Sequence, residues 1–193
     1  MTERASLWGA LRSGCFPHQL SSLIDNPLRR LVIKPETLAD RLSLTPSSQI
    51  LEVGPGSGYF SLELARRVPQ GRLELLDVQP EMIDKAMRKF GRAPPPNVGW
   101  TAADAGEELP FDDNRFDIVL LITVLGEISG REQALRSFLR VLRPGGTLAV
   151  HEHLPDPDFL RLQRLRAMVE AAGFEFMRHQ GPAWNYTALF VKP

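Results

Sequence analysis

The stretch Gln49–Gly58, which reads Q-I-L-E-V-G-P-G-S-G, decides how the rest of this chain is interpreted. Its first half is the apolar, β-branched run that is typical of a buried strand. Three glycines follow at alternate positions, Gly54, Gly56 and Gly58. Because glycine tolerates positive φ and has no Cβ, the chain can turn tightly here and expose bare backbone to a ligand. A helix predicted over Tyr59–Val68 would present its unpaired N–H groups to the same ligand.

A strand, a glycine turn and a helix in this order are the usual nucleotide-binding opening of a doubly wound α/β domain. The glycine spacing nevertheless differs from the dinucleotide fingerprint G-x-G-x-x-G, because Tyr59 stands where the last glycine would fall. A carboxylate, Glu52, also lies two residues before the first glycine. The alternative interpretation is a tight turn that holds no ligand.

The composition indicates a folded domain and gives no sign of a nucleic-acid or anionic-lipid partner. The chain has 193 residues, of which 43% are hydrophobic and 24% charged, values that are ordinary for one soluble domain. A formal net charge of +0 gives no overall attraction to nucleic acid or to anionic lipid. The single cysteine, Cys15, excludes an internal disulfide and fits a reducing compartment. No apolar stretch has transmembrane length, and we expect a cytoplasmic protein with no membrane span.

Strands and helices alternate after the glycine turn, which predicts right-handed βαβ units around a parallel sheet. We predict strands at Arg72–Val78, Val98–Ala103, Phe116–Val124 and Thr147–His151, with helices at Pro80–Phe90, around Leu135–Leu142, and from Asp156-Pro157 to Gly173. Phe174–Met177 and Tyr186–Val191 should form an antiparallel hairpin, with Trp184 and Tyr186 in its core. We divide the chain into a helical N-terminal extension, residues 1–48, packed on a main domain, residues 49–193.

Three carboxylates follow predicted strands. Glu52 belongs to the first strand, Asp77 ends the second, and Asp104 ends the third. Because the carboxyl ends of parallel strands meet at one crevice, we expect the three acids to lie together there. Asp77 stands about twenty residues after the turn, where a carboxylate accepts hydrogen bonds from ribose hydroxyls. The alternatives are a loop-capping role for Asp77 and a solvated loop position for Asp104.

Four motifs in this order resemble those of class I S-adenosylmethionine-dependent methyltransferases. They read E-V-G-P-G-S-G from Glu52, L-D-V-Q-P-E-M from Leu76, D-A-G-E-E-L-P-F-D-D-N-R-F-D-I-V from Asp104 and L-R-V-L-R-P-G-G-T-L from Leu139. The likeness is greatest to the small-molecule group that includes the quinone-biosynthesis C-methyltransferases. It implies a doubly wound, Rossmann-like α/β fold with seven strands in the order 3-2-1-4-5-7-6, the seventh antiparallel. It also implies methyl transfer from S-adenosylmethionine to an unidentified small-molecule acceptor.

The resemblance also implies roles for individual residues. The backbone of the glycine turn would hold the methionine part of the cofactor, and Glu52 would support its ammonium group. Asp77 would bind the ribose, Asp104 with Ala105 would hold the adenine, and Thr123 would lie near the methyl group. The implied cofactor-binding residues are therefore Glu52, Gly54, Pro55, Gly56, Gly58, Asp77, Val78, Asp104, Ala105 and Thr123.

The candidates for a catalytic base are His151, His153 and Glu127. The two histidines follow the fifth strand, and strand alternation puts both on one face and Glu152 on the other. Since no third ligand accompanies them, we predict no metal site. A general base at the crevice is one interpretation, and polar residues at a strand end are the other. Glu127 lies after the fourth strand, where related enzymes often carry an aromatic or histidine-rich segment.

Two other functional classes stay open: a NAD(P)-dependent oxidoreductase, and a non-catalytic nucleotide-binding module of the same fold. We expect the acceptor to enter over the ends of the fourth and fifth strands, under residues 1–34 as a cover. His18 would belong to that cover or to the surface. The sequence does not predict the oligomeric state.

Overall fold

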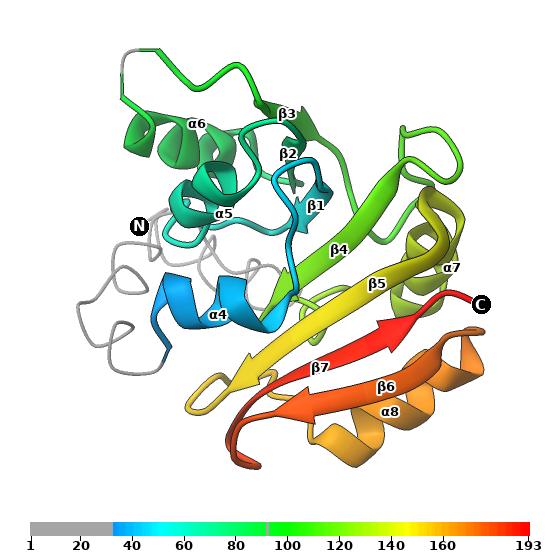
Figure 1. Ribbon diagram of the computed structural model, residues 1–193. Helices are drawn as coiled ribbons and strands as arrows, with labels where there is room; N and C mark the ends of the chain where they lie inside the picture. The colour runs from blue at the N-terminus through cyan, green and yellow to red at the C-terminus, as the bar shows by residue number, and fades with distance from the viewer. Residues whose placement is uncertain (1–32, 92) are drawn as a thin grey trace, which may run out of the picture.

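A computed structural model of the chain describes residues 33–91 and 93–193 (Figure 1). In these residues seven strands form one sheet in the order β3-β2-β1-β4-β5-β7-β6. The strands are β1 (Gln49–Val53), β2 (Arg72–Asp77), β3 (Val98–Ala102), β4 (Phe116–Ile122), β5 (Leu142–His153), β6 (Glu175–Gln180) and β7 (Asn185–Val191). The helices are α4 (Pro35–Arg41), α5 (Ser61–Arg67), α6 (Pro80–Lys89), α7 (Arg131–Val141) and α8 (Leu162–Ala171).

The pairing of the strands confirms the predicted fold. β1 runs parallel to both β2 and β4, so the strand order reverses between β1 and β4, the topological switch point of a doubly wound sheet. β7 pairs antiparallel with β5 and with β6, as a hairpin with no helix between its strands requires. The C-terminal ends of β1 to β5 therefore lie along one edge of the sheet.

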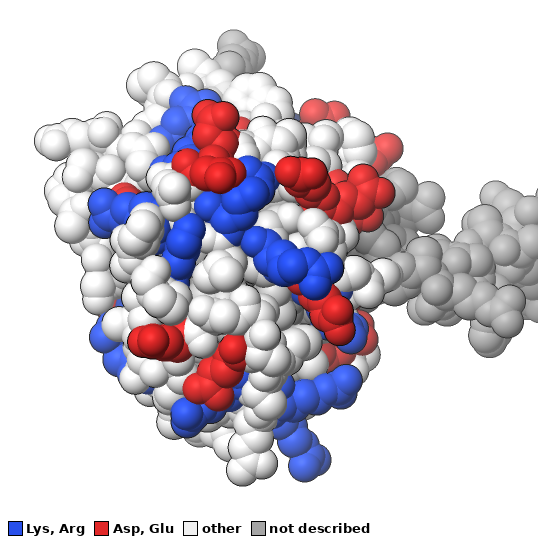
Figure 2. Space-filling view, turned by 90° about the vertical axis from the view of Figure 1, so that its right-hand side faces the viewer, with Lys and Arg blue, Asp and Glu red and all other residues white. Residues whose placement is uncertain are grey.

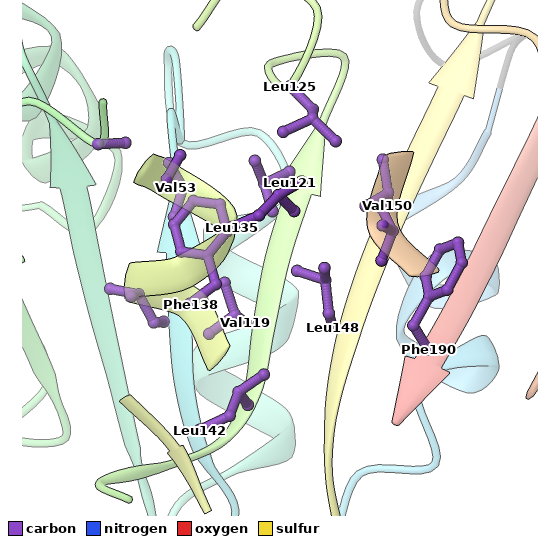
Figure 3. Close-up of a cluster of buried hydrophobic side chains, with 14 of the residues drawn as sticks. Val53, Val119, Leu121, Leu125, Leu135, Phe138, Leu142, Leu148, Val150 and Phe190 are labelled. Atoms are coloured by element: carbon purple, nitrogen blue, oxygen red, sulfur yellow. The ribbon is translucent and has the colours of Figure 1, made fainter. Parts of the chain in front are cut away.

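Helices cover both faces of the sheet, and the two faces have separate hydrophobic cores. The core against α4, α5 and α6 includes Leu38, Leu64 and Ala86, while the core against α7 and α8 includes Phe138 and Val169. Figure 3 shows Leu135 and Phe138 of α7 beside Val119 and Leu121 of β4. Burial on both faces explains why β4 is nearly all apolar, from Phe116 to Ile122.

Two predicted helix starts were wrong. The first helix after the glycine turn begins at Ser61 rather than Tyr59, because residues 55–60 are used by turns. The last helix begins at Leu162, after the extended residue Arg161. Asp156 does not cap it: its Oδ1 accepts the N–H of Asp158 at 2.9 Å, which closes a local turn.

The antiparallel hairpin of β6 and β7 is confirmed, but the prediction of its core residues was half right. Tyr186 is fully buried, but Trp184 is 54% exposed. Trp184 lies in the connection between β6 and β7, and its carbonyl accepts the N–H of Leu154 at 2.9 Å. The backbone of Trp184 therefore extends the pairing of β5 with β7, whereas its side chain lies largely outside the core.

Of the predicted N-terminal extension, the structure describes residues 33–48, in which α4 begins at Pro35 and buries Leu38 and Ala39. Residues 1–32, with Cys15 and His18, lie outside the described residues. Within 33–91 and 93–193 no helix is long and apolar enough to span a membrane. Basic and acidic side chains are interleaved on the face in Figure 2, in keeping with the balanced charge of the chain.

Candidate functional site

A cavity of about 570 Å³ lies at the C-terminal ends of β1, β2 and β4. Its walls come from these strand ends and from the loops that follow them, including the loop between β4 and α7. The lining residues are Glu52, Val53, Gly54, Pro55, Gly56, Ser57, Phe60, Leu76, Asp77, Val78, Gln79, Met82, Ala103, Asp104, Ala105, Gly106, Glu107, Ile122, Thr123, Val124, Glu127, Ile128, Ser129 and Gly130. This is the crevice in which doubly wound folds bind their ligands.

The three glycines of the turn have different roles. All have positive φ, with values of 63°, 57° and 75° for Gly54, Gly56 and Gly58. Gly54 and Gly56 line the cavity, and a Cβ on Gly56 would face open space, with the Met82 Cε at 4.0 Å. Gly58 does not line it: a Cβ there would lie 2.9 Å from the Cα of Ala86 in α6. Gly58 thus allows α6 to pack closely, which differs from its expected place in the cofactor site.

Glu52 offers a buried carboxylate oxygen in the wall of the cavity. The hydroxyl of Ser61 donates to its Oε2 at 2.6 Å, and its Oε1 has no hydrogen-bond partner among the described residues. Burial raises the pKa of Glu52 to about 7, against the opposing effect of the Ser61 hydrogen bond. A cationic group of a ligand would both satisfy Oε1 and favour the ionised carboxylate.

Asp77 combines the ligand position with the loop-capping role. It lines the cavity at the end of β2, is 9% exposed, and accepts the N–H of Gln79 on Oδ1 at 2.9 Å. Burial raises the pKa of Asp77, and the backbone N–H groups of Gln79 and Val78 act in the opposite direction. The hydrogen bond to Gln79 fixes the carboxylate at the cavity edge, so the two interpretations of this residue are compatible.

Asp104 and Ala105 form the part of the wall that follows β3. The N–H of Ala103 donates to the Asp77 carbonyl at 3.1 Å, which carries the β2–β3 pairing to the edge of the cavity. Asp104 is exposed, and its Oδ1 accepts the N–H of Gly106 at 2.7 Å. Ala105 is buried and lines the cavity beside it. The three predicted acids therefore do meet around one cavity.

Thr123 ends β4 with an unusual backbone. Its φ is 54°, a region that β-branched residues rarely adopt. Its N–H donates to the carbonyl of His151 at 2.8 Å, and its side chain is buried in the cavity wall. The strand ends at Ile122, two residues before the predicted boundary, because the chain turns at Thr123.

The histidines lie on one face of β5, but they do not line the cavity. Nδ1 of His151 lies 3.0 Å from the hydroxyl of Thr187, which also accepts a hydrogen bond from Arg41 of α4. His151 thus packs toward the α4 side of the sheet, away from the expected place of a base. Among the described residues, no group of three His, Cys, Asp or Glu side chains is arranged to hold a metal ion. Of the three candidates, Glu127 alone lines the cavity.

Several lining residues were not predicted. Ile128, Ser129 and Gly130 come from the loop after β4, and Met82 comes from the first turn of α6. The only sequence signal for them was their position just after a strand end. Which residues of such a loop turn back over the cavity depends on how the loop packs.

The family model described as "Methyltransferase domain" matches residues 50–146, about half of the chain. The chain belongs to this methyltransferase family. The ubiquinone/menaquinone biosynthesis C-methyltransferase UbiE of Idiomarina loihiensis is 38% identical over 106 residues, covering 54% of this chain and 42% of that protein. UbiE of Azotobacter vinelandii is 36% identical over 132 residues, which cover 67% of this chain and 50% of that protein. The methyltransferase chain thus spans about half the length of these relatives.

Solved structures share the fold of this methyltransferase. A SAM-dependent methyltransferase from Aquifex aeolicus aligns with a TM-score of 0.84 at 22% identity, covering 93% of this chain and all of that one. The [4+2]-cyclase SpnF aligns with a TM-score of 0.68 at 29% identity, and the alignment covers 76% of this chain and 57% of that one. The family and the fold are those of class I S-adenosylmethionine-dependent methyltransferases, whose cofactor is S-adenosylmethionine. They do not favour the oxidoreductase alternative.

Proposed function

We propose that this chain transfers the methyl group of S-adenosylmethionine to a small-molecule acceptor. The observation that carries the proposal is the pair of buried carboxylates, Glu52 and Asp77, which line one cavity together with the glycine turn. An acidic wall suits a cationic ligand with ribose hydroxyls and suits a diphosphate poorly. The open space in front of Gly56 leaves room for the ligand against bare backbone.

The residues that would hold the cofactor follow from this wall. Glu52 would accept from the ammonium group through its unpartnered Oε1. Asp77 would accept from the ribose hydroxyls, with Val78 beside it, and Asp104 with Ala105 would border the adenine. Bound S-adenosylmethionine supplies an electrophilic methyl group on a sulfonium. The protein then aligns the acceptor with that methyl group and excludes water, since positive charge disappears in the transfer.

Glu127 is the side chain that we assign to proton removal, should the acceptor carry a proton on its nucleophilic atom. It lines the cavity in the loop after β4. The relatives named as C-methyltransferases make a carbon nucleophile of a quinone precursor the first acceptor to test. Methylation of a ring carbon displaces a proton, and a carboxylate base at the cavity would accept it.

The test is transfer of a labelled methyl group. Purified protein is incubated with methyl-labelled S-adenosylmethionine and either a demethylated quinone precursor or a small-molecule extract. We expect label in an organic product of at least one incubation. Label in the quinone precursor supports the carbon acceptor, whereas label only in extract components supports another small molecule. No transfer to either, by protein that binds the cofactor, would contradict the catalytic proposal and favour a binding module.

A further inference from the structure

One residue of the loop between β5 and α8 is held on both of its backbone groups by side chains from the sheet. The N–H of Leu160 donates to Oε2 of Glu152 at 3.1 Å, and its carbonyl accepts from the hydroxyl of Tyr186. Glu152 and Tyr186 are register partners in the antiparallel pair of β5 and β7, and both are buried. The two side chains therefore act as a clamp on Leu160.

The loop held by this clamp supports a wall of the cofactor cavity. Gly126, in the loop after β4, packs against the backbone of Asp158: a Cβ on Gly126 would lie 2.8 Å from the Cβ of Asp158 and closer still to its carbonyl oxygen. The same loop is also held by Arg131, whose guanidinium donates to the carbonyls of Leu125, at 3.0 Å, and of Gly126. The next residue in the chain is Glu127, which lines the cavity.

The surroundings of Glu152 favour its neutral form. Its Oε1 has no hydrogen-bond partner among the described residues. Among the described residues, the titratable groups that act on it are acids: Asp156 and Asp158 of its own loop, Glu127 of the cavity wall, and the Tyr186 hydroxyl. Burial, followed by the three carboxylates, raises the pKa of Glu152 to about 8, although its bond from Leu160 opposes this. An ionised Glu152 would repel the loop that it holds.

We propose that Glu152 is a positioning residue: through Leu160 and Asp158 it holds Gly126 in place, and its ionisation loosens the cavity wall that carries Glu127. This inference rests on the proposed function, because the cavity wall matters only if the cavity binds the cofactor. Glu152 does not line the cavity itself, so its effect on a ligand is indirect. This contact also explains why residue 126 is a glycine, since the close approach of Asp158 leaves no room for a side chain there.

The test measures the affinity for S-adenosylhomocysteine, the product of the cofactor, from about pH 6.5 to about pH 9, on either side of the pKa of Glu152. Glu52 and the amino group of the probe also titrate in this range, so the informative quantity is the ratio of the affinities of wild type and Glu152→Gln. We expect a ratio near one at the lower pH. At the higher pH the wild type should bind about tenfold more weakly than the variant, the effect of one pKa unit of coupling.

The matched control is Glu175→Gln, the same change at an exposed position of β6, which should follow the wild-type profile. A second variant, Asp156→Asn, keeps an oxygen acceptor for Asp158 and removes one negative charge beside Glu152. It should move the pH of half-maximal loss to a lower value, because the neutral carboxyl is less favoured. An affinity ratio that stays constant with pH, or an unmoved midpoint in Asp156→Asn, would overturn the positioning role and leave the proposed function intact. Absence of binding at every pH would overturn both.

Discussion

The hydroxyl of Ser61 donates to one carboxylate oxygen of Glu52 at 2.6 Å, and the other oxygen has no partner among the described residues. A buried carboxylate with one hydrogen-bonded oxygen and one unpartnered oxygen can accept a hydrogen bond from a ligand. The helix α5 supplies the donor that orients it, and the strand β1 supplies its burial. The missing partner is what we assign to the cofactor ammonium.

This arrangement predicts opposite pH dependences for binding and for stability. The ionised form of Glu52 binds the ammonium group, so the affinity for S-adenosylmethionine should fall as the pH is lowered through about 7, the pKa of Glu52. Glu52→Gln should bind more weakly than wild type at about pH 8 and lose the part of the pH profile centred near 7. Calorimetric titration at several pH values measures both. A variant that binds as tightly as wild type would remove Glu52 from the site.

The free energy of unfolding should depend on pH in the opposite direction from the cofactor affinity. The pKa of Glu52 is higher in the folded than in the unfolded protein, so the folded state holds more protons between about pH 4.5 and about pH 7. Stability should therefore fall as the pH rises through this window, by up to about 3 kcal/mol. In urea unfolding, the free energy of unfolding of Glu52→Gln should not show this fall, so the variant should become more stable relative to the wild type as the pH rises. Parallel pH curves for the two proteins would contradict this.

The glycines of the turn predict two separable defects. Gly58→Ala should lower the free energy of unfolding by about 2 kcal/mol or more, because its Cβ meets the backbone of Ala86 at positive φ. The folded fraction should keep its cofactor affinity. Gly56→Ala should cost about 1–2 kcal/mol from its φ alone, and it should also weaken cofactor binding, because its Cβ faces the cavity. Urea unfolding and calorimetric titration measure the two effects; equal losses of affinity would refute the distinction.

We predict that loss of the Glu127 carboxylate slows turnover and leaves cofactor binding unchanged. Glu127→Gln should slow methyl transfer by about 10²-fold or more, the usual effect of a general base, and should bind the cofactor as wild type does. Glu107→Gln is the matched control, because it makes the same change at another lining residue. If the acceptor needs no base, or another group serves, Glu127→Gln will turn over as fast as the control, and our assignment fails.

We predict that removing most of the segment 1–34 impairs use of the acceptor. We expect deletion of residues 1–30 to leave cofactor binding unchanged and to abolish transfer to the acceptor, because we assign to this segment the covering of the acceptor. α4 begins after the deletion, so its buried Leu38 and Ala39 stay in the core. Label transfer and cofactor titration are measured on the same preparation. Normal turnover by the truncated protein would end this idea.

Much of the fold could be predicted because its signals are local. The apolar strands, the glycine turn and the helices that follow several of the strands can be recognised from neighbouring residues alone, and the order of the strands followed from the family resemblance. The carboxylates Glu52, Asp77 and Asp104 could be brought together because parallel strands end at one edge. These predictions needed no knowledge of how the loops pack.

The errors concern contacts between distant parts of the chain. Gly58 resembles its neighbours in sequence, and only the approach of α6 shows that it serves packing. Asp156 has the residue type of a helix cap but closes a turn with Asp158. Alternation correctly placed His151 and His153 on one face, yet it does not tell which face borders the cavity. These distinctions depend on tertiary structure, and the periodicity of the sequence is silent about them.

The central claim is that this cavity binds S-adenosylmethionine through Asp77, and calorimetric titration of the full chain tests it most directly. Wild type should bind S-adenosylmethionine and not NADH. Asp77→Ala should lose roughly 2 kcal/mol or more of binding free energy, because two charge-assisted hydrogen bonds to the ribose would be absent. Glu107→Ala, which removes an exposed acid of the same wall to which we assign no cofactor contact, is the comparison for a purely electrostatic effect. Binding of NADH in place of S-adenosylmethionine, or unchanged affinity in Asp77→Ala, would contradict the account.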